Sequence, residues 1–319
     1  MSGNQHNLSS YLKRTYKLKN ELGSGGNGCV IMAWHTRLNK DVVIKIVENC
    51  LPDATALHRN EAEALKNIKS IHIPMVLDFF IEDGKSYTIM EHISGVSFDK
   101  LLNQGSKFKE EQVIKWYRQL SSALEIMHNI GICHRDIKPA NIMHQISGDV
   151  CLIDFNSALV SGNNTGVVSR SMGYASPEQY QYFKACQSTQ NTDSSYDDEY
   201  LETMLLTDDC KTESGVSIAM EIDKNPDCFV PRNDKEMGLS AMTSNQIDWK
   251  LSDIYSLGAT IYHFLTGERP PVTADGVNDI TKTPGYSGIL LAIIRKSMQT
   301  KPKKRFSSVS DLSKALSWF

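Results

Sequence analysis

The stretch His134-Arg135-Asp136-Ile137-Lys138-Pro139-Ala140-Asn141 decides the fold of this 319-residue chain. It follows residues 110–128, whose apolar side chains recur at helical spacing, and it carries a carboxylate, a lysine and an amide at fixed offsets. A solitary aspartate in a loop is most often a turn residue. Asp136, Lys138 and Asn141 together rarely recur by chance, so they indicate a loop that handles charge in a reaction.

A second carboxylate lies downstream, in Asp154-Phe155-Asn156. It follows the apolar run 150–153, which places Asp154 at the end of a predicted strand. Oxygen ligands of this kind suit Mg²⁺. The alternative is again an ordinary turn residue.

A glycine-rich stretch precedes both, and it reads Leu22-Gly23-Ser24-Gly25-Gly26-Asn27-Gly28-Cys29-Val30. It lies between two strand-like runs, 16–22 and 29–34, where glycines let the backbone bring its amides close to phosphate oxygens. A flexible hairpin is the simpler interpretation. A dinucleotide-binding fingerprint would need a helix directly after the glycines, and a strand pattern follows instead.

A lysine ends the next predicted strand, Val42-Val43-Ile44-Lys45, 17 residues after Gly28. Most strand-edge lysines are only solvated. At this spacing one hairpin turn returns the chain beneath the glycines, where the ammonium of Lys45 could bind phosphates. A carboxylate must then hold Lys45. Glu61 on the predicted helix 54–68 is the better candidate, because it precedes the apolar Leu65 by one turn, and Glu63 is expected to face solvent.

In this order and spacing, these motifs resemble those of the protein kinase superfamily. The resemblance continues in Gly173-Tyr174-Ala175-Ser176-Pro177-Glu178, which is similar to the end of a kinase activation segment. It also includes Ser252-Asp253-Ile254-Tyr255-Ser256-Leu257-Gly258, similar to the buried helix whose aspartate braces the catalytic loop. Arg305 is placed like the arginine that pairs with Glu178. The residues of these motifs resemble those of bacterial Hanks-type, eukaryotic-like kinases more than those of animal kinases.

The resemblance implies a role for each motif. Asp136 accepts the hydrogen bond of the substrate hydroxyl, and Lys138 neutralises the γ-phosphoryl group of ATP. Mg²⁺, or Mn²⁺ as the alternative, is held by Asn141 and Asp154. The residues implied in ATP binding are Leu22, Gly23, Ser24, Gly25, Gly26, Asn27, Gly28, Val30, Val43, Ile153, Lys45 held by Glu61, the gatekeeper Met90, and the hinge from Glu91 to Ile93.

Lysine two residues after Asp136 is typical of the serine/threonine class of these kinases. Arg135 implies a phosphate partner in the activation segment, with Thr165 and Ser169 as candidate sites, whereas Ser171 is expected to contact Asp136 and Lys138. Asn156 departs from the pattern, because it replaces a glycine, although asparagine tolerates positive φ better than most residues.

The resemblance implies an α+β bilobal fold. We expect an N-terminal extension over residues 1–15, an antiparallel β-sheet N-lobe with one main helix over 16–93, and a mainly α C-lobe over 94–319. An insertion at about 181–248 interrupts the C-lobe; it holds 14 acidic and 5 basic residues, against 23 acidic and 29 basic in the remainder. Its expected role is a tolerated surface loop, with a docking or regulatory partner as the alternative.

Composition excludes several other classes. Seven cysteines without a CxxC pair argue against a disulfide framework or a structural zinc site, and a net charge of −3 gives no reason to expect nucleic acid or membrane as partners. The polar first ten residues lack a signal peptide, so a cytoplasmic location is expected. The resemblance therefore predicts an ATP-dependent kinase that acts on serine and threonine hydroxyls of proteins and phosphorylates itself. The alternatives are a pseudokinase scaffold and a small-molecule kinase such as an aminoglycoside phosphotransferase, which Lys138-Pro139 disfavours.

Overall fold

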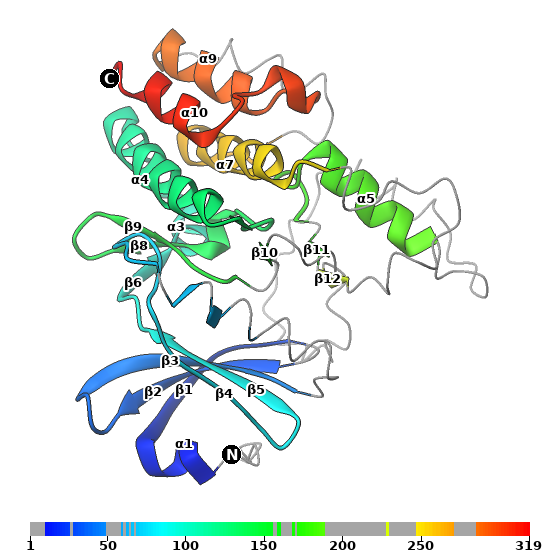
Figure 1. Cartoon of the computed structure of the whole chain (residues 1–319). Coiled ribbons are helices and arrows are strands. Elements are labelled where there is room, and N and C mark those ends of the chain that lie inside the picture. The colour runs from blue at the N-terminus through cyan, green and yellow to red at the C-terminus, as the bar shows by residue number, and fades with distance from the viewer. Residues whose placement is uncertain are drawn as a thin grey trace, which may run out of the picture.

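The structure is a computed structural model that describes residues 10–25, 28–48, 59, 62–63, 65–66, 68–155, 158–160, 168–169, 171–188, 228–229, 247–270 and 285–319. A β-sheet lies at one end of the molecule and the long helices at the other, as Figure 1 shows. This arrangement confirms the α+β bilobal fold. No helix within these ranges is both long and apolar enough to cross a membrane.

The N-lobe sheet is antiparallel, with the strand order β1-β2-β3-β5-β4. Its strands are β1 (Tyr16–Gly25), β2 (Gly28–His35), β3 (Lys40–Val47), β4 (Val76–Glu82) and β5 (Lys85–Glu91). Side chains of β2 and β3 alternate between buried and half-buried, as expected for a sheet with one face in the core. The turn between β4 and β5 uses Asp83 and Gly84, both at positive φ (52° and 71°).

A short helix, α1 (Ser10–Thr15), lies within the predicted N-terminal extension and packs on this sheet. Leu12 is buried in the N-lobe core, and the ring of Tyr11 contacts Phe80 edge to face at 4.9 Å. The Tyr11 hydroxyl also donates to Asp78 Oδ2 at 3.0 Å. Of the predicted helix 54–68, Arg59, Ala62, Glu63 and Leu65 are described and helical, whereas the rest lies largely outside the described residues.

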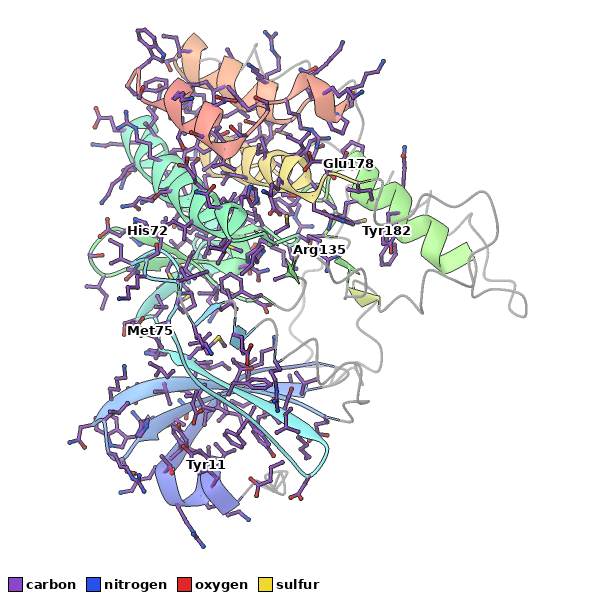
Figure 2. All side chains as sticks on the ribbon, viewed as in Figure 1. Tyr11, His72, Met75, Arg135, Glu178 and Tyr182 are labelled. Carbon is purple, nitrogen blue, oxygen red and sulfur yellow. The ribbon has the colours of Figure 1, made fainter. Side chains whose placement is uncertain are left out.

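The segment that precedes β4, which includes His72 and Met75, contacts both lobes (Figure 2). Its His72 bonds to the C-lobe through Nδ1 to Val150 O (2.7 Å). Three residues later, Met75 O accepts from the backbone N–H of Glu91 (2.9 Å), at the end of the N-lobe sheet. The chain is thus tied to both lobes within a few residues.

The C-lobe core is formed by the helices α4 (Glu110–Asn129), α7 (Trp249–Thr266), α9 (Gly288–Ser297) and α10 (Val309–Leu316). The other helices of the C-lobe are α3 (Phe98–Asn103), α5 (Pro177–Ser188) and the 3-10 turns η1 (Pro139–Asn141) and η5 (Pro302–Lys304). The α7 helix begins where Asp248 accepts hydrogen bonds from the N–H groups of Lys250 and Leu251, and it ends at Gly267 in the left-handed conformation.

Short strands connect these helices. One small sheet joins β6 (Gly95–Ser97), β8 (Ile142–Gln145) and β9 (Val150–Leu152). Two further pairs join β7 (Ile132–Cys133) to β10 (Leu159–Val160) and β11 (Val168–Ser169) to β12 (Cys228–Phe229). These strands carry the catalytic loop and the activation segment on the side of the C-lobe that faces the N-lobe (Figure 1).

The first residues of the predicted insertion, whose bounds stay a prediction, are helical. Residues 181–188 complete helix α5, and Tyr182 and Phe183 are buried in it. At the other end, Ile247 is buried and Asp248 caps α7. Since 189–227 and 230–246 lie outside the described residues, the structure assigns only the flanks of the insertion and β12.

Candidate active site

Asp253, a fully buried residue of α7, supports the catalytic loop through hydrogen bonds to its backbone. Its Oδ2 accepts from the backbone N–H of His134 (2.8 Å) and its Oδ1 from that of Arg135 (2.8 Å). His128, in the last turn of α4, adds a bond of 2.9 Å from Nε2 to Oδ2. Arg135 has φ +61°, a conformation that costs a non-glycine residue energy, so these bonds stabilise a loop shape that the chain alone disfavours.

Asp136 is the centre of a polar network. Its Oδ1 accepts from the Ser171 hydroxyl (2.7 Å), and its Oδ2 lies 3.1 Å from Lys138 Nζ. Lys138 Nζ also donates to Ser171 Oγ (2.9 Å). The Asn141 side-chain amide donates to Asp136 Oδ2 (2.9 Å) and to the Asp136 backbone oxygen (2.8 Å). A hydroxyl therefore lies between a carboxylate and an ammonium group, which is the contact expected for Ser171.

Asn141 and Asp154 fit a divalent cation. Because the amide nitrogen of Asn141 is committed to Asp136, its side-chain oxygen is the atom left to act as a ligand. The backbone oxygen of Asn141 accepts from Ile153 N–H (2.8 Å), which brings Asp154, the next residue, to the same place. Asp154 has φ +65°, and carboxylate and amide oxygens are the ligands that Mg²⁺ prefers.

The predicted nucleotide-binding residues of the N-lobe lie on adjacent strands. Residues 23–25 of β1 pair with 28–30 of β2, so the glycine-rich stretch forms a hairpin end, of which Gly26 and Asn27 lie outside the described residues. Lys45 pairs with Val30 on one side and Thr88 on the other, and Val43 pairs with Met90. This register places the lysine directly beside the base of the glycine loop.

Gly28 has a packing role that the sequence does not reveal. A Cβ atom at this position would lie 2.1 Å from the backbone oxygen of Ile46, so only glycine lets β2 approach β3 this closely. Glu61, the predicted partner of Lys45, lies outside the described residues, whereas Glu63 is exposed, as expected. The Lys45–Glu61 pair therefore stays a prediction.

The backbone N–H of Glu91, the first residue of the predicted hinge, already has a partner within the protein. The N–H of Glu91 donates to Met75 O (2.9 Å), so Glu91 can offer a nucleotide base its carbonyl only. Met90 and Ile93 are half-buried beside it, and Leu22 is 53% exposed at the edge of the glycine loop.

The end of the activation segment is fixed to the C-lobe by a buried ion pair. Glu178 Oε1 and Oε2 accept from Arg305 Nη1 (2.6 Å) and Nη2 (2.8 Å). Gln179 donates to the backbone oxygen of Arg135 (2.7 Å) and accepts from the Ser252 hydroxyl (3.0 Å), which connects the segment to both the catalytic loop and α7. Figure 2 shows Arg135, Glu178 and Tyr182 on this flank of the C-lobe.

Of the two candidate phosphorylation sites, the structure describes only Ser169. Thr165 lies outside the described residues, as does Asn156, and Ser169 belongs to β11, where its backbone pairs with Cys228. Arg135, the predicted partner of a phosphate, is buried, with its guanidinium 5.0 Å from the ring centre of Trp249. The role of Arg135 in binding phosphate stays a prediction.

Tyr174, near the end of the activation segment, and His263 of α7 both have shifted pKa values. Burial, with a further contribution from Arg269, lowers the pKa of His263 to about 4, and burial raises the pKa of Tyr174 to about 12. The two groups are 2.6 Å apart, between Tyr174 Oη and His263 Nδ1. A neutral imidazole that accepts from a neutral phenol satisfies both polar groups at pH 7.

His128, Cys133 and Asp253 have ligand atoms within 4.8 Å of one another, a cluster that could in principle hold a metal ion. Both Asp253 oxygens already accept hydrogen bonds from the catalytic loop, and burial raises the pKa of the Cys133 thiol. The cluster therefore acts as a structural support. Sequence reasoning missed His128, and the only signal was a histidine in the last turn of the helix that precedes the loop.

Residues 16–195 match the protein kinase domain, which is more than half of the chain. The chain belongs to the protein kinase family, whose members use ATP, a divalent cation and protein substrates. This confirms the resemblance from which the fold was predicted.

Similar proteins come from several bacteria. A probable serine/threonine-protein kinase of Clostridium acetobutylicum is 31% identical over 54% of this chain and 28% of its own length. One of Streptomyces coelicolor is 34% identical over 51% of this chain and 26% of its own. The serine/threonine-protein kinase PknA of Corynebacterium glutamicum is 30% identical over 54% and 40%. These relatives support the bacterial Hanks-type assignment, but the chain covers well under half of their length.

Proposed function

We propose that the chain is a serine/threonine protein kinase that transfers the γ-phosphoryl group of ATP to serine and threonine hydroxyls of proteins, including its own. The observation that carries the proposal is the Ser171 hydroxyl, 2.7 Å from Asp136 Oδ1 and 2.9 Å from Lys138 Nζ. The Ser171 hydroxyl thus contacts the same carboxylate and ammonium group that a substrate serine or threonine hydroxyl would contact during transfer. The names of the bacterial relatives support the same substrate class.

The chemistry follows from these groups. Asp136 accepts the hydrogen bond of the acceptor hydroxyl and directs its oxygen lone pair toward the γ-phosphorus. As the new O–P bond forms, the bond from the γ-phosphorus to the β–γ bridging oxygen breaks, ADP leaves, and the hydroxyl proton passes to the carboxylate. Lys138, 3.1 Å from Asp136, neutralises charge on the transferred group.

The nucleotide is oriented by the N-lobe in this proposal. Lys45 and the glycine-rich hairpin hold the phosphates, and the Glu91 carbonyl and the Ile93 N–H bind adenine between Val43 and Ile153. Mg²⁺ bound by Asn141 and Asp154 would supply neutralisation of the phosphate oxygens. A cytoplasmic location stays a prediction of the sequence.

A pseudokinase is the second function that the sequence left open, and none of the described residues of the site favours it. Asp136, Lys138 and Asn141 form one network, and Asp154 lies beside it. A scaffold without transfer would not need these charged groups to converge.

Incubation of the purified chain with ATP and Mg²⁺, followed by mass-spectrometric mapping, tests the proposal. We expect phosphate on serine or threonine residues, with no incorporation when the metal is chelated. Phosphate confined to tyrosine would overturn the substrate class. An absence of phosphate both on the chain and on a generic serine/threonine substrate would favour the pseudokinase.

A further inference from the structure

The C-terminal part of the chain carries a strongly basic face. Between Gly285 and Ser310 the sequence contains six basic residues and no Asp or Glu. One of the six, Arg305, is buried and pairs with Glu178. The other five are exposed, and we call them the basic face: Arg295, Lys296, Lys301, Lys303 and Lys304.

Helix α9 and the turn η5 bring these side chains together. Arg295, Lys296 and Lys304 line a single cavity of about 480 Å³ with Ala292 and Gln299, and no acidic residue lines it. The Lys296 ammonium lies 4.3 Å from the ring centre of Phe306, a cation–π contact that limits the motion of this lysine. None of the five basic side chains forms an ion pair with any residue in the described ranges. The face is therefore a concentration of positive charge with no negative partner within that part of the protein.

The negative charge of the chain is concentrated in one segment of the insertion. Residues 189–227 contain 11 acidic and 2 basic residues, whereas residues 230–246 contain two of each. The segment follows directly on helix α5 and precedes β12, so both of its ends are attached to the C-lobe.

We propose that residues 189–227 dock on the basic face of the same chain. The charges are complementary, −9 on the segment against five cations that form no ion pair with the described residues. Its 39 residues could span about 130 Å when extended, far more than the dimensions of one lobe. A tethered partner also has an effective concentration on the order of millimolar, which favours it over an acidic partner in solution.

The position of the face gives this docking a consequence. Figure 1 shows α9 at the end of the C-lobe opposite the N-lobe sheet, and α5 on the flank between. Docking would hold the acidic segment along the C-lobe and away from the cleft where ATP binds.

Zero-length cross-linking with a water-soluble carbodiimide tests the contact, because it joins a carboxylate to a lysine only when the two touch. In the full chain at about 0.05 M salt we expect cross-links from residues 189–227 to Lys296, Lys301, Lys303 and Lys304, and about tenfold fewer at 0.5 M salt, where charges are screened over a few ångströms. Lys13, Lys100 and Lys107, which are also exposed, should give few. Equal labelling of the two lysine sets would overturn the proposal.

Two charge-reversal variants extend the test. In one, Lys296→Glu, Lys303→Glu and Lys304→Glu reverse three of the five charges of the basic face. In the control, Lys13→Glu, Lys100→Glu and Lys107→Glu make the same change in net charge elsewhere. We expect a larger hydrodynamic radius at low salt for the first variant only, with equal melting temperatures for both. Identical radii in both variants contradict docking on this face.

A mixture of isotopically light and heavy chains separates docking within one chain from docking between two copies. Docking within the chain gives only all-light and all-heavy cross-linked pairs. Mixed pairs in proportion to the label ratio would show that a second copy supplies the segment, and they would overturn the proposal as stated.

Discussion

Removal of Arg305 from its buried pair with Glu178 should destabilise the protein more than any change to an exposed ion pair. The exposed fractions of the two side chains are 0% and 7%, and the guanidinium makes two bonds to the carboxylate, at 2.6 and 2.8 Å. It also donates to three backbone oxygens, those of Gln299, Leu251 and Thr300. Arg305→Met leaves the carboxylate of Glu178 buried without a counter-charge, a situation that costs about 3–5 kcal/mol.

Urea unfolding followed by tryptophan fluorescence measures this loss. With a slope of about 3 kcal/mol per molar urea, the midpoint should fall by about 1 to 1.7 M. Adding Glu178→Gln to Arg305→Met removes the uncompensated charge and should restore about 1–2 kcal/mol. Lys314→Met, which breaks the exposed pair with Asp311, is the control and should leave the midpoint unchanged. A shift for Arg305→Met as small as that of the control would refute the reasoning.

Three further changes test other parts of the structure. Asp253→Asn puts an NH₂ group against the N–H donors of the catalytic loop, which costs about 1–3 kcal/mol of stability. We expect phosphoryl transfer to slow at least about tenfold in steady-state kinetics, with ATP binding unchanged in calorimetry. An unchanged rate would refute the bracing role of Asp253. Gly28→Ala, whose Cβ would lie 2.1 Å from Ile46 O, should destabilise the protein by about 1–3 kcal/mol. The control Gly288→Ala has open space around its Cβ and should leave the melting temperature unchanged. Equal melting temperatures for the two variants would contradict the packing argument. Burial lowers the pKa of His263 to about 4, so the folded state binds fewer protons and loses stability as pH falls from 6.5 toward 4. Allowing for partial exposure, His263→Gln should remove about 1 kcal/mol of the stability difference between pH 7 and pH 5, and the same difference in both proteins would disprove this.

The strands, the long helices and the catalytic loop could be predicted because their signals are local. Period-two alternation marks β2 and β3, and period 3.6 marks α4. Asp136, Lys138 and Asn141 lie within six residues of one another, so one loop conformation brings them together.

Contacts between distant segments could not be predicted in the same way. His128 and Asp253 are 125 residues apart, and only the packing of α4 against α7 makes them neighbours. The close approach of Gly28 to the Ile46 oxygen depends on the register between β2 and β3, which glycine spacing alone does not specify.

The helical start of the predicted insertion was missed for a compositional reason. Polar residues such as Gln181 and Gln187 made 181–188 resemble the acidic segment that follows. In the structure, Pro177 begins helix α5, and the burial of Tyr182 and Phe183 keeps this stretch in the C-lobe. Two buried aromatic residues thus outweigh the polar average of their neighbours.

The most direct test of the central claim is the rate of phosphoryl transfer by Asp136→Asn, measured with saturating ATP and Mg²⁺ beside a control, Asp99→Asn, at a half-buried aspartate of α3. The account predicts a loss of about 10²–10⁴-fold for Asp136→Asn alone, because the amide cannot accept the hydroxyl proton, with ATP affinity and melting temperature preserved. Equal rates in Asp136→Asn and the wild type would contradict it.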